Sequence, residues 1–416
     1  MHLLIEGGKK LSGTVSIEGA KNAVLPACAA SLLTDDPVII HRAPPLRDVR
    51  TILAVIEELG KDVRYQAGTI TILSTGTLIP RASREHVERM RASFLVLGPL
   101  LARLGRAEVP LPGGCTIGPR PVDYHLQGLR AFGVEVREER NEVIITGEKL
   151  RGMRFRLPYP SVGATEQLLM AASLADGITT IANPSREPEV LDLVALLKKM
   201  GARIADVDGA FVIEGVSALR GAEHAVIPDR LEAGTYLIAG MITGGEVKVD
   251  GARDDHLTAL ITALNRAGAT VETGNGWIKV KAEDRIHPLA VETAPFPGFP
   301  TDLQPPLVAL LSLAEGVSTV RDTVFPTRFS YIGELARMGA RISVSNSIAT
   351  ITGVKRLNGA LLTAPDIRAG AALVLAALAA NGQSSIEGLE QLDRGYANLE
   401  KKLTSLGAEI VRQKEK

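Results

Sequence analysis

The chain has 416 residues, which is too long for one ordinary hydrophobic core and predicts two domains of about two hundred residues each. Its 47 Lys and Arg residues balance its 47 Asp and Glu residues, so no global field attracts nucleic acid or an anionic membrane surface. Any anion site must therefore be local.

The two cysteines, Cys28 and Cys115, are too few for a disulfide framework and predict a reducing compartment. The start of the chain shows no basic flank before a long apolar stretch, and the longest apolar run, Ala369 to Ala380, is too short to cross a membrane. We therefore expect a cytoplasmic protein. Cys28 lies in the apolar run ALPACAASLL and is expected to be a helix-core residue.

In chain order, the sequence repeats a helix that ends at a glycine and is followed by alternating apolar and polar residues. The segments are ELGKDV, AFGVEV, KMGARI, RAGATV, RMGARI and SLGAEI, with the glycines at Gly60, Gly133, Gly201, Gly268, Gly339 and Gly407. By subtraction, successive glycines lie 73, 68, 67, 71 and 68 residues apart. Glycine with a positive φ commonly closes a helix, and the alternation predicts a half-buried strand after it. We predict six copies of one α/β unit, three in each domain, with threefold pseudo-symmetry.

An earlier helix in each unit is rich in small residues and apolar on nearly every side, which is typical of a buried helix. We expect these helices inside each domain, with the sheets and the more polar second helices outside. Their starts carry polar residues at matching distances from the glycines: Lys21 and Asn22, Arg91, Ser161 to Gly163, Asp229 and Arg230, Thr301 and Asp302, and Arg368. Parallel inner helices would bring their N-termini, with unpaired N–H groups and positive dipole ends, to one face suited to phosphate.

These polar residues also have purely structural explanations. Ser161 and the pair Thr301–Asp302 are good helix N-caps, and an isolated Arg91 or Arg368 is commonly a solvated surface charge. Lys21 and Arg91 at helix starts nevertheless oppose the helix dipole, which favours a bound anion there. The acidic residues at the start of another helix are explained by dipole compensation alone; they are Glu187, Glu189 and Asp192.

The stretch from Leu111 to His125, LPGGCTIGPRPVDYH, is predicted to be an exposed loop because its prolines and glycines cannot continue a helix or a central strand. Gly113 and Gly114 would let the loop move Cys115. A thiol near the guanidinium of Arg120 ionises or gives up a proton more readily, whereas a lone cysteine is more often a small buried hydrophobe. Because loops carry function more often than cores do, Cys115 is a candidate reactive thiol.

The sequence resembles the UDP-N-acetylglucosamine 1-carboxyvinyltransferase family over essentially the whole chain, through GAKNAVLP, RMRASFLVLGPL, LPGGCTIGPRPVD, SVGAT, REPE, FPTDLQ, DTVFPTRF and LDRGY. The resemblance implies transfer of the enolpyruvyl group of phosphoenolpyruvate to the 3-hydroxyl of UDP-N-acetylglucosamine, with release of phosphate, as the first committed step of peptidoglycan synthesis. It implies an inside-out α/β barrel of six βαβαββ-type repeats in two domains, residues 21–228 and residues 1–20 plus 229–416, with the active site in the cleft between them. No cofactor, metal, nucleic acid or membrane partner is expected, and the protein is expected to be a monomer or a weak homo-oligomer.

Carried over residue by residue, the resemblance implies that Cys115 is the general acid, able to form a covalent adduct with the pyruvyl unit, and that Asp302 accepts the proton of the sugar 3-hydroxyl. Lys21 and Arg394 are the other implied catalytic residues. Phosphoenolpyruvate carries two anionic groups, which suit a set of cations and polar residues implied at Lys21, Asn22, Arg120 and Arg394. The remaining implied substrate contacts are Arg91, Pro121, Val122, Asp123, Tyr124, Ser161, Val162, Gly163, Val324, Arg328 and Arg368.

Two features depart from the family pattern, and two other functions compete with this one. Tyr159-Pro160 precedes SVGAT where some relatives have Lys-Val, which removes one uridine-diphosphate contact, and Tyr124 stands where others carry Leu. The related 5-enolpyruvylshikimate-3-phosphate (EPSP) synthase lacks a catalytic thiol in this loop, so the LPGGC motif argues against it. A non-catalytic UDP-sugar sensor is expected to have lost Cys115, Asp302 or Lys21, and zero net charge disfavours a nucleic-acid clamp.

Overall fold

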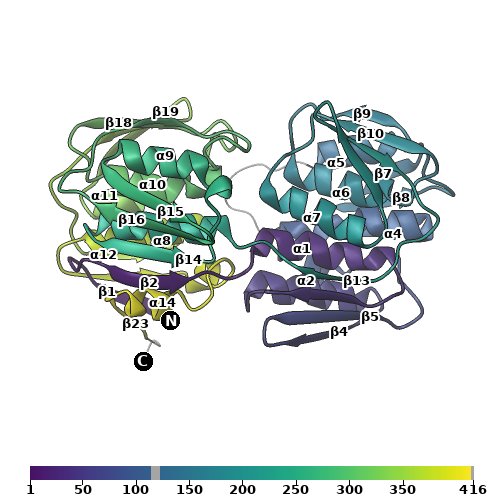
Figure 1. Cartoon of the computed structure of the whole chain (residues 1–416), viewed down its shortest axis with the longest axis horizontal. Coiled ribbons are helices and arrows are strands. Elements are labelled where there is room, and N and C mark those ends of the chain that lie inside the picture. The colour runs from purple at the N-terminus through teal and green to yellow at the C-terminus, as the bar shows by residue number, and fades with distance from the viewer. Residues whose placement is uncertain (114–121, 414–416) are drawn as a thin grey trace. The chain divides into compact units, whose positions relative to one another are not determined.

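The computed structural model describes residues 1–113 and 122–413 and divides them into two compact units (Figure 1). The middle unit comprises residues 19–113 and 122–227, and the terminal unit comprises residues 1–18 and 228–413, so both chain termini belong to the terminal unit. Among the described helices, none combines the length and the apolar character needed to cross a membrane. The sequence-based prediction of an α/β protein is confirmed, because helices and strands alternate along both units.

The described residues of the middle unit form three sheets. The first has the order β13-β3-β5-β4, from Ala222–Ala225, Val38–His41, Thr69–Ser74 and Lys61–Gln66. The second has the order β6-β8-β7, from Arg106–Pro110, Glu142–Thr146 and Glu135–Glu139. The third has the order β11-β12-β10-β9, from Arg203–Val207, Ala210–Glu214, Ile178–Ala182 and Arg154–Arg156.

The terminal unit also has three sheets in its described part. The first has the order β15-β16-β14-β2, from Ala269–Gly274, Trp277–Ala282, Glu246–Asp250 and Ser12–Ser16. The second has the order β17-β18-β20-β19, from Ala290–Glu292, Val317–Arg321, Ile348–Thr352 and Arg341–Ser345. The third has the order β21-β22-β1-β23, from Leu361–Thr363, Gln383–Glu387, His2–Glu6 and Glu409–Gln413.

The sheets share one strand pattern. Each four-stranded sheet has one parallel edge strand, as in the pairs β9 with β10 and β17 with β18, followed by antiparallel neighbours. In the three-stranded sheet, an isolated parallel bridge from Arg81 to Glu108 lies at β6, at the edge where the other sheets carry the parallel strand. In the last sheet the N-terminal strand β1 pairs with both β22 and β23, so that Leu3 lies opposite Ile386 on one side and Arg412 on the other.

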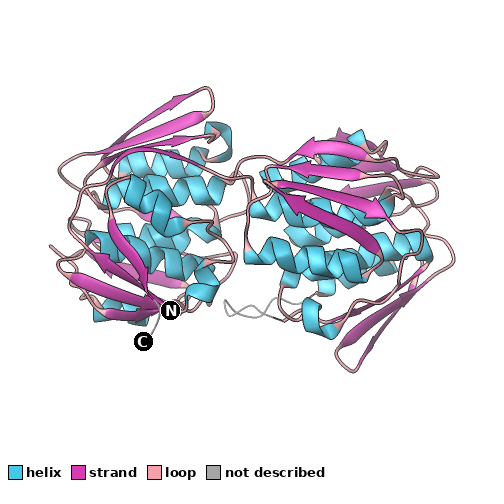
Figure 2. Cartoon of the chain, turned by 90° about the horizontal axis from the view of Figure 1, so that it is seen from below, coloured by secondary structure: helices cyan, strands magenta, loops and turns pink. Residues whose placement is uncertain are grey.

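Within each unit, a group of buried helices lies inside the ring of sheets (Figure 2). Every residue of α8 and α10 is buried, as expected for helices that are apolar on all sides. Two of the inner helices start with a 3-10 turn, η2 before α4 and η4 before α10. The inner elements are α1 (Lys21–Ala30), η2 (Arg91–Val96), α4 (Leu97–Leu104), α6 (Val162–Ala172), α8 (Arg230–Ile242), η4 (Thr301–Leu303), α10 (Gln304–Leu311) and α12 (Ile367–Ala379).

The second helix of each repeat ends at one of the six predicted glycines. Their φ angles lie between 84° and 103°, a left-handed conformation that favours glycine, so this prediction is confirmed. A strand follows each glycine, as the alternating sequence predicted. These second helices are α2 (Arg47–Glu58), α5 (Asp123–Arg130), α7 (Pro188–Lys199), α9 (Thr258–Arg266), α11 (Ile332–Arg337) and α14 (Leu399–Ser405). The short connecting helices are η1 (Ser31–Leu33), α3 (Arg84–Val87), η3 (Asp254–His256) and α13 (Leu389–Leu392).

The prediction of an exposed loop up to His125 is wrong at its end. Helix α5 already begins at Asp123, and Val122 and His125 are buried. His125 Nδ1 is hydrogen-bonded to Gln167 Oε1, and its ring meets the ring of Phe94 edge-on with 5.6 Å between the centroids. An amphipathic helix that packs on α6 therefore replaces the final part of the expected loop.

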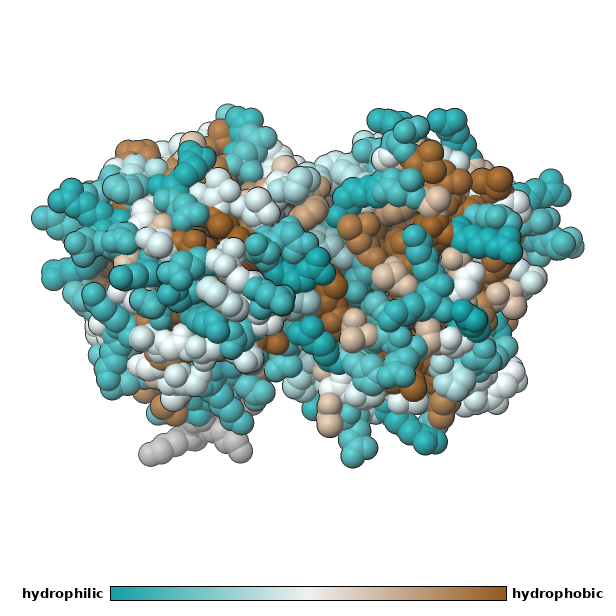
Figure 3. Space-filling model, viewed as in Figure 1, coloured by the Kyte–Doolittle hydropathy of each residue, from teal (hydrophilic) through white to brown (hydrophobic). Residues whose placement is uncertain are grey.

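Cys28 is fully buried in α1, which confirms its predicted place in a helix core. Burial raises the pKa of its thiol well above the usual range, so the thiol is protonated and unreactive at neutral pH. On the face that Figure 3 displays, hydrophilic residues predominate around smaller hydrophobic areas, in keeping with the balanced charge of the sequence.

Candidate active site

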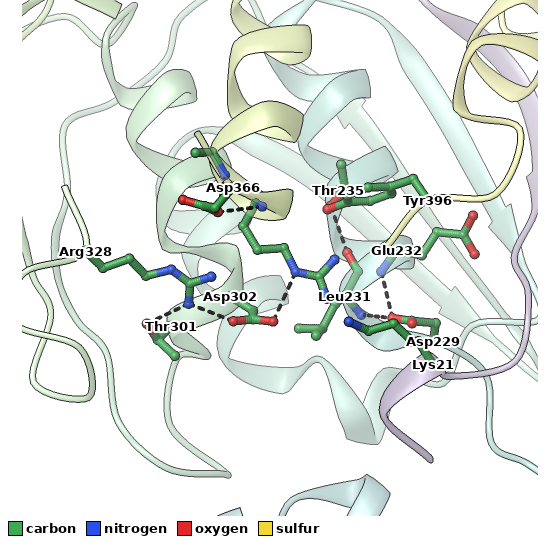
Figure 4. A network of polar contacts seen from close by, with 12 residues as sticks. Lys21, Asp229, Leu231, Glu232, Thr235, Thr301, Asp302, Arg328, Asp366 and Tyr396 are labelled. Carbon is green, nitrogen blue, oxygen red and sulfur yellow. Dashed lines mark hydrogen bonds and ion pairs between the residues drawn. The ribbon is translucent and has the colours of Figure 1, made fainter. Parts of the chain in front are cut away.

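A buried ion-pair cluster lies where the inner helices of the terminal unit begin. Asp302 lies in η4, Arg368 in the first turn of α12, and Arg328 in the loop after β18. Arg328 Nη1 donates to Asp302 Oδ1 at 2.7 Å (Figure 4). Arg368 Nε donates to Asp302 Oδ2 at 3.0 Å, so each carboxylate oxygen accepts from a different guanidinium. Three residues named from the sequence are thus brought together from three separate chain segments.

The cluster keeps the Asp302 carboxyl ionised. Each arginine side chain is only 4% exposed, whereas the Asp302 side chain is 27% exposed. Burial alone would raise the pKa of Asp302, but the charges and hydrogen bonds of Arg328 and Arg368 outweigh it and hold the pKa far below its usual range. The site therefore presents a partly accessible carboxylate that is charged at neutral pH.

Two structural explanations offered for these residues are wrong. Thr301 and Asp302 do not cap a helix, because Pro300 and Leu303 occupy the N-cap positions of η4 and α10 without a side-chain cap bond. Asp302 instead accepts charge-assisted hydrogen bonds, which are stronger than a bond from a neutral backbone N–H. Arg368 is buried at 3% exposure and is no solvated surface charge.

Arg368 is held by the residues around it. Asp366 is the N-cap of α12 and accepts from the backbone N–H groups of Arg368 and Ala369, at 2.9 and 3.0 Å. The Arg368 guanidinium lies 5.3 Å from the ring centroid of Tyr396, whose hydroxyl is 2.9 Å from Thr235 Oγ1. The cap fixes the backbone and the tyrosine ring packs against the guanidinium, so the direction of Arg368 toward Asp302 is set by the fold.

Other predicted residues of the terminal unit lie at the same helix starts or near them. Asp229 is the N-cap of α8, and Arg230, 7% exposed, has its guanidinium 5.9 Å from the ring centroid of Phe296. Arg394 follows α13, is half-buried, and donates from Nη1 to Gln391 Oε1 at 3.2 Å.

In the middle unit, Lys21 opens α1 and is almost fully buried. Its Nζ donates to Asp48 Oδ2 at 3.0 Å, with 9% of the lysine and 5% of the aspartate side chain exposed. The adjacent Asn22 is half-buried. The helix dipole had suggested a bound anion beside Lys21, and the structure supplies a carboxylate of the protein, from the first turn of α2. The dipole argument alone therefore does not require a ligand at Lys21.

The start of α6 is shaped by its contact with α5. Ser161 is the N-cap, as one explanation predicted, and its Oγ accepts from the backbone N–H of Ala164 at 3.4 Å. Val162 is 37% exposed. A Cβ at Gly163 would lie 2.9 Å from His125 Cε1, so a larger residue there would displace the imidazole. The small Gly163 thus lets His125 of α5 pack beside the start of α6, while Val162 at the same place stays exposed.

The remaining predicted contacts of the middle unit lie at two further helix starts. Arg91 opens η2 and is half-buried, and Asp123 and Tyr124 are half-buried in the first turn of α5. Cys115, Arg120 and Pro121 lie outside the described residues, so the thiol and its neighbouring cation stay predictions.

Sequence reasoning missed several buried carboxylates beside the predicted residues of each unit. Asp48 could have been found, because it falls on the buried face of α2 with Val49, Ile52 and Ile56. Asp322 and Asp366 had no signal of that kind, since Asp322 follows a strand and Asp366 precedes a helix. Within residues 1–113 and 122–413, no three His, Cys, Asp or Glu side chains are grouped so that they could hold a metal ion.

Comparison with known proteins identifies the class. The family model of EPSP synthase (3-phosphoshikimate 1-carboxyvinyltransferase) matches residues 5–403. The enolpyruvyl transferase NikO from Streptomyces tendae matches with a TM-score of 0.89 and 27% identity over 99% of this chain and 98% of that one. EPSP synthase from Acinetobacter baumannii has the same fold, with a TM-score of 0.75 at 19% identity over 99% of this chain and 100% of that one. The fold and the match thus define a carboxyvinyl transferase of the EPSP synthase family.

Curated relatives narrow this further. UDP-N-acetylglucosamine 1-carboxyvinyltransferase from Gloeobacter violaceus is 47% identical over 99% of this chain and 90% of its own length. UDP-N-acetylglucosamine 1-carboxyvinyltransferase 1 from Staphylococcus aureus is 46% identical over 99% of both chains. The chain belongs to the UDP-N-acetylglucosamine 1-carboxyvinyltransferases of that family, as its motifs predicted.

Proposed function

We propose that the chain transfers the enolpyruvyl group of phosphoenolpyruvate to the 3-hydroxyl of UDP-N-acetylglucosamine and releases inorganic phosphate. In the addition step, C3 of phosphoenolpyruvate gains a proton while the sugar oxygen bonds to C2 and loses its own proton. The product of this step is a tetrahedral ketal. In the elimination step, C3 loses a proton and the C2–O bond to phosphate breaks, which restores the double bond.

The observation that supports this proposal most strongly is the ion-pair cluster at Asp302, in a chain that belongs to the UDP-N-acetylglucosamine 1-carboxyvinyltransferases. A partly exposed carboxylate, kept ionised by Arg328 and Arg368, is equipped to accept a proton from a bound hydroxyl. The N–H groups of the same two guanidiniums can also donate charge-assisted hydrogen bonds to anionic groups of a substrate.

Roles for the other residues belong to the same proposal. Cys115 donates the proton to C3 as general acid and can form a covalent adduct with the pyruvyl unit. Lys21, Arg120 and Arg394 bind the phosphate and the carboxylate of phosphoenolpyruvate, and Asn22 contacts the same substrate. The residues proposed to contact the UDP-sugar are Arg91, Pro121, Val122, Asp123, Tyr124, Ser161, Val162, Gly163 and Val324. Arg328 and Arg368 are proposed to bind substrate as well.

We further propose that the six repeats form two inside-out barrels with threefold pseudo-symmetry, and that the substrates take contacts from both units. The shared strand pattern of the sheets and the buried inner helices support this arrangement. The cysteine content supports a cytoplasmic enzyme, and we propose that it acts as a monomer or a weak homo-oligomer.

The test is phosphate release from phosphoenolpyruvate by the purified full chain, with UDP-N-acetylglucosamine or shikimate 3-phosphate as acceptor. We expect release only with the UDP-sugar. An epoxide phosphonate that alkylates thiols should abolish the release and add its mass to the peptide that carries Cys115. Cys28 serves as an internal control, because burial and its raised thiol pKa protect it in the folded protein.

Each other outcome has a definite meaning. Release with shikimate 3-phosphate would assign the EPSP synthase reaction, and release with neither acceptor would favour the sensor. A Cys115→Ala protein that turns over at the parent rate would remove the thiol from the mechanism.

A further inference from the structure

A second carboxylate, Asp322, lies behind the Asp302 cluster and has no surface exposure. It follows β18 directly and accepts four hydrogen bonds. Its Oδ1 accepts from Thr293 Oγ1 at 2.9 Å and from the backbone N–H groups of Val324 and Phe325 at 3.0 and 2.8 Å. Its Oδ2 accepts from Thr301 Oγ1 at 2.7 Å. A buried carboxylate with this many donors is fixed in direction.

The bond to Thr301 connects Asp322 to the cluster. A threonine hydroxyl has one proton, and carboxylate Oδ2 can only accept, so that proton points to Asp322. The lone pairs of the hydroxyl are then free for Arg328 Nη1, which donates to Thr301 Oγ1 at 3.2 Å. The same Nη1 donates to Asp302 Oδ1 at 2.7 Å. The chain of bonds thus runs from Asp322 through Thr301 and Arg328 to Asp302 (Figure 4 shows its last three members).

The other oxygen of Asp322 fixes the segment that carries Arg328. By accepting from Val324 and Phe325, Asp322 closes the turn after β18, and the Arg328 backbone N–H then donates to the Phe325 carbonyl at 3.0 Å. Arg328 is thereby held at its backbone and at its guanidinium. Both of these restraints on Arg328 depend on hydrogen bonds to the carboxylate of Asp322.

We propose that Asp322 is a positioning residue for the enolpyruvyl transfer, acting through Thr301 to hold Arg328 against Asp302. This inference rests on the proposed function. Asp322 touches no reacting atom in this scheme. Its effect is to orient the guanidinium of Arg328, which in turn holds the carboxylate of Asp302 in place. Arg368, on α12, holds the other oxygen of Asp302 independently.

The ionisation of Asp302 depends on the charged and titratable groups around it, so these groups decide how a variant is interpreted. Arg328 and Arg368 face it directly, from the loop after β18 and from α12. The charge of Asp366 acts on Arg328, and Tyr396 and Asp229 act on Arg368. Replacing Thr301 alters none of these groups and removes no charge, so a change in the ionisation of Asp302 in Thr301→Val would report on the position of Arg328, whereas Asp322→Asn also removes a nearby negative charge.

The experiment compares Asp322→Asn, Thr301→Val and Thr301→Ser in the full chain. An asparagine amide in place of Oδ2 would donate to Thr301 and turn the hydroxyl proton of Thr301 toward Arg328. The O–H group of Thr301 and the N–H group of Arg328 would then both be donors and could not bond to each other. Valine keeps the shape of threonine and removes the hydroxyl. We expect both variants to lower kcat for phosphate release by 10- to 100-fold with a smaller change in KM, and Thr301→Ser to recover at least a third of kcat. The double variant should lose little beyond either single one, because both break the same chain of bonds.

Thr293→Val is the matched control. It removes a hydrogen bond to the other oxygen of Asp322 and leaves the chain through Thr301 intact, so kcat should fall less than threefold. Two pH-dependent readouts separate positioning from simple destabilisation. In Thr301→Val but not Thr293→Val, the acid limb of kcat should move to higher pH, and the ¹³C signal of labelled Asp302 should titrate at a higher pH than in wild type.

Wild-type kcat and an unshifted Asp302 titration in Thr301→Val would overturn the inference. A lower melting temperature with unchanged kcat would also overturn it, because that result assigns Asp322 to stability alone. If the wild-type protein released phosphate with neither acceptor, the proposed function would fail. The carbon titration would then still decide whether Asp322 sets the position of Arg328.

Discussion

Replacing Asp302 by asparagine should destabilise the terminal unit as well as stop turnover. The change keeps the shape of the side chain and removes the charge that two guanidiniums share, at 2.7 and 3.0 Å. Both arginine side chains are 4% exposed and cannot turn to water without unpacking. The variant therefore leaves two buried cations without their common partner.

The expected size follows from the burial. Removing one partner of a buried pair costs about 3–5 kcal/mol, and the 27% exposure of Asp302 favours the lower end, about 3 kcal/mol. For a unit of about two hundred residues this corresponds to a melting temperature roughly 6–12 °C lower. Because the folded-state pKa of Asp302 is depressed, its contribution is fully present above the unfolded-state pKa of about 4 and is lost as pH falls below it. The difference between wild type and variant should therefore be constant from pH 5 to 8 and shrink in acid.

Thermal unfolding by circular dichroism at several pH values measures this difference. Asp393→Asn is the matched control, since Asp393 also accepts two bonds from one guanidinium, that of Arg412, but both side chains are partly exposed. We expect that control to lose less than about 1 kcal/mol. Inorganic phosphate should raise the melting temperature of Asp302→Asn more than that of wild type, because it can replace the lost negative charge. Equal melting temperatures for Asp302→Asn and wild type would refute the reasoning.

Two further changes test buried carboxylates elsewhere. Asp48→Asn should lower the free energy of unfolding by about 3–5 kcal/mol in urea, because it leaves the buried Lys21 ammonium at a positive helix end, and Asp48→Glu should recover part of the loss. Burial raises the pKa of Glu232 to about 7 against the opposing charge of Lys402, so the folded protein holds a proton that the unfolded chain has released. Wild type should thus lose stability relative to Glu232→Gln as pH rises from about 4.5 to 7, by on the order of 3 kcal/mol, and a pH-independent difference between the two would contradict this.

The parts of the fold that depend on local sequence could be predicted. A glycine such as Gly60 or Gly407 closes its helix through its own φ angle, and the apolar residues around it show which face is buried. The same reasoning placed Cys28 in a helix core. It failed at His125, because the prolines before it mask the start of a helix whose buried side packs against α6.

The site could be predicted only as a set of residue names. The resemblance named Asp302, Arg328 and Arg368, yet their mutual bonds join positions 26 and 66 residues apart and depend on how three segments meet. Periodicity favoured an N-cap role for Asp302, since it could not see the two guanidiniums that compete for the carboxylate. Asp322 shows the same limit, because its importance comes entirely from groups that approach it in space.

The low pKa of Asp302 also constrains the order of proton transfers in the proposed reaction. A carboxylate held by two guanidiniums is a weak base and does not remove a proton from a neutral sugar hydroxyl before bond formation. Once C3 of phosphoenolpyruvate is protonated, C2 becomes strongly electrophilic, and the hydroxyl proton becomes acidic as its oxygen bonds to C2. A weak base at the right position then suffices. In the proposed reaction, protonation by the general acid therefore comes first, and Arg328 and Arg368 contribute by holding the carboxylate in position.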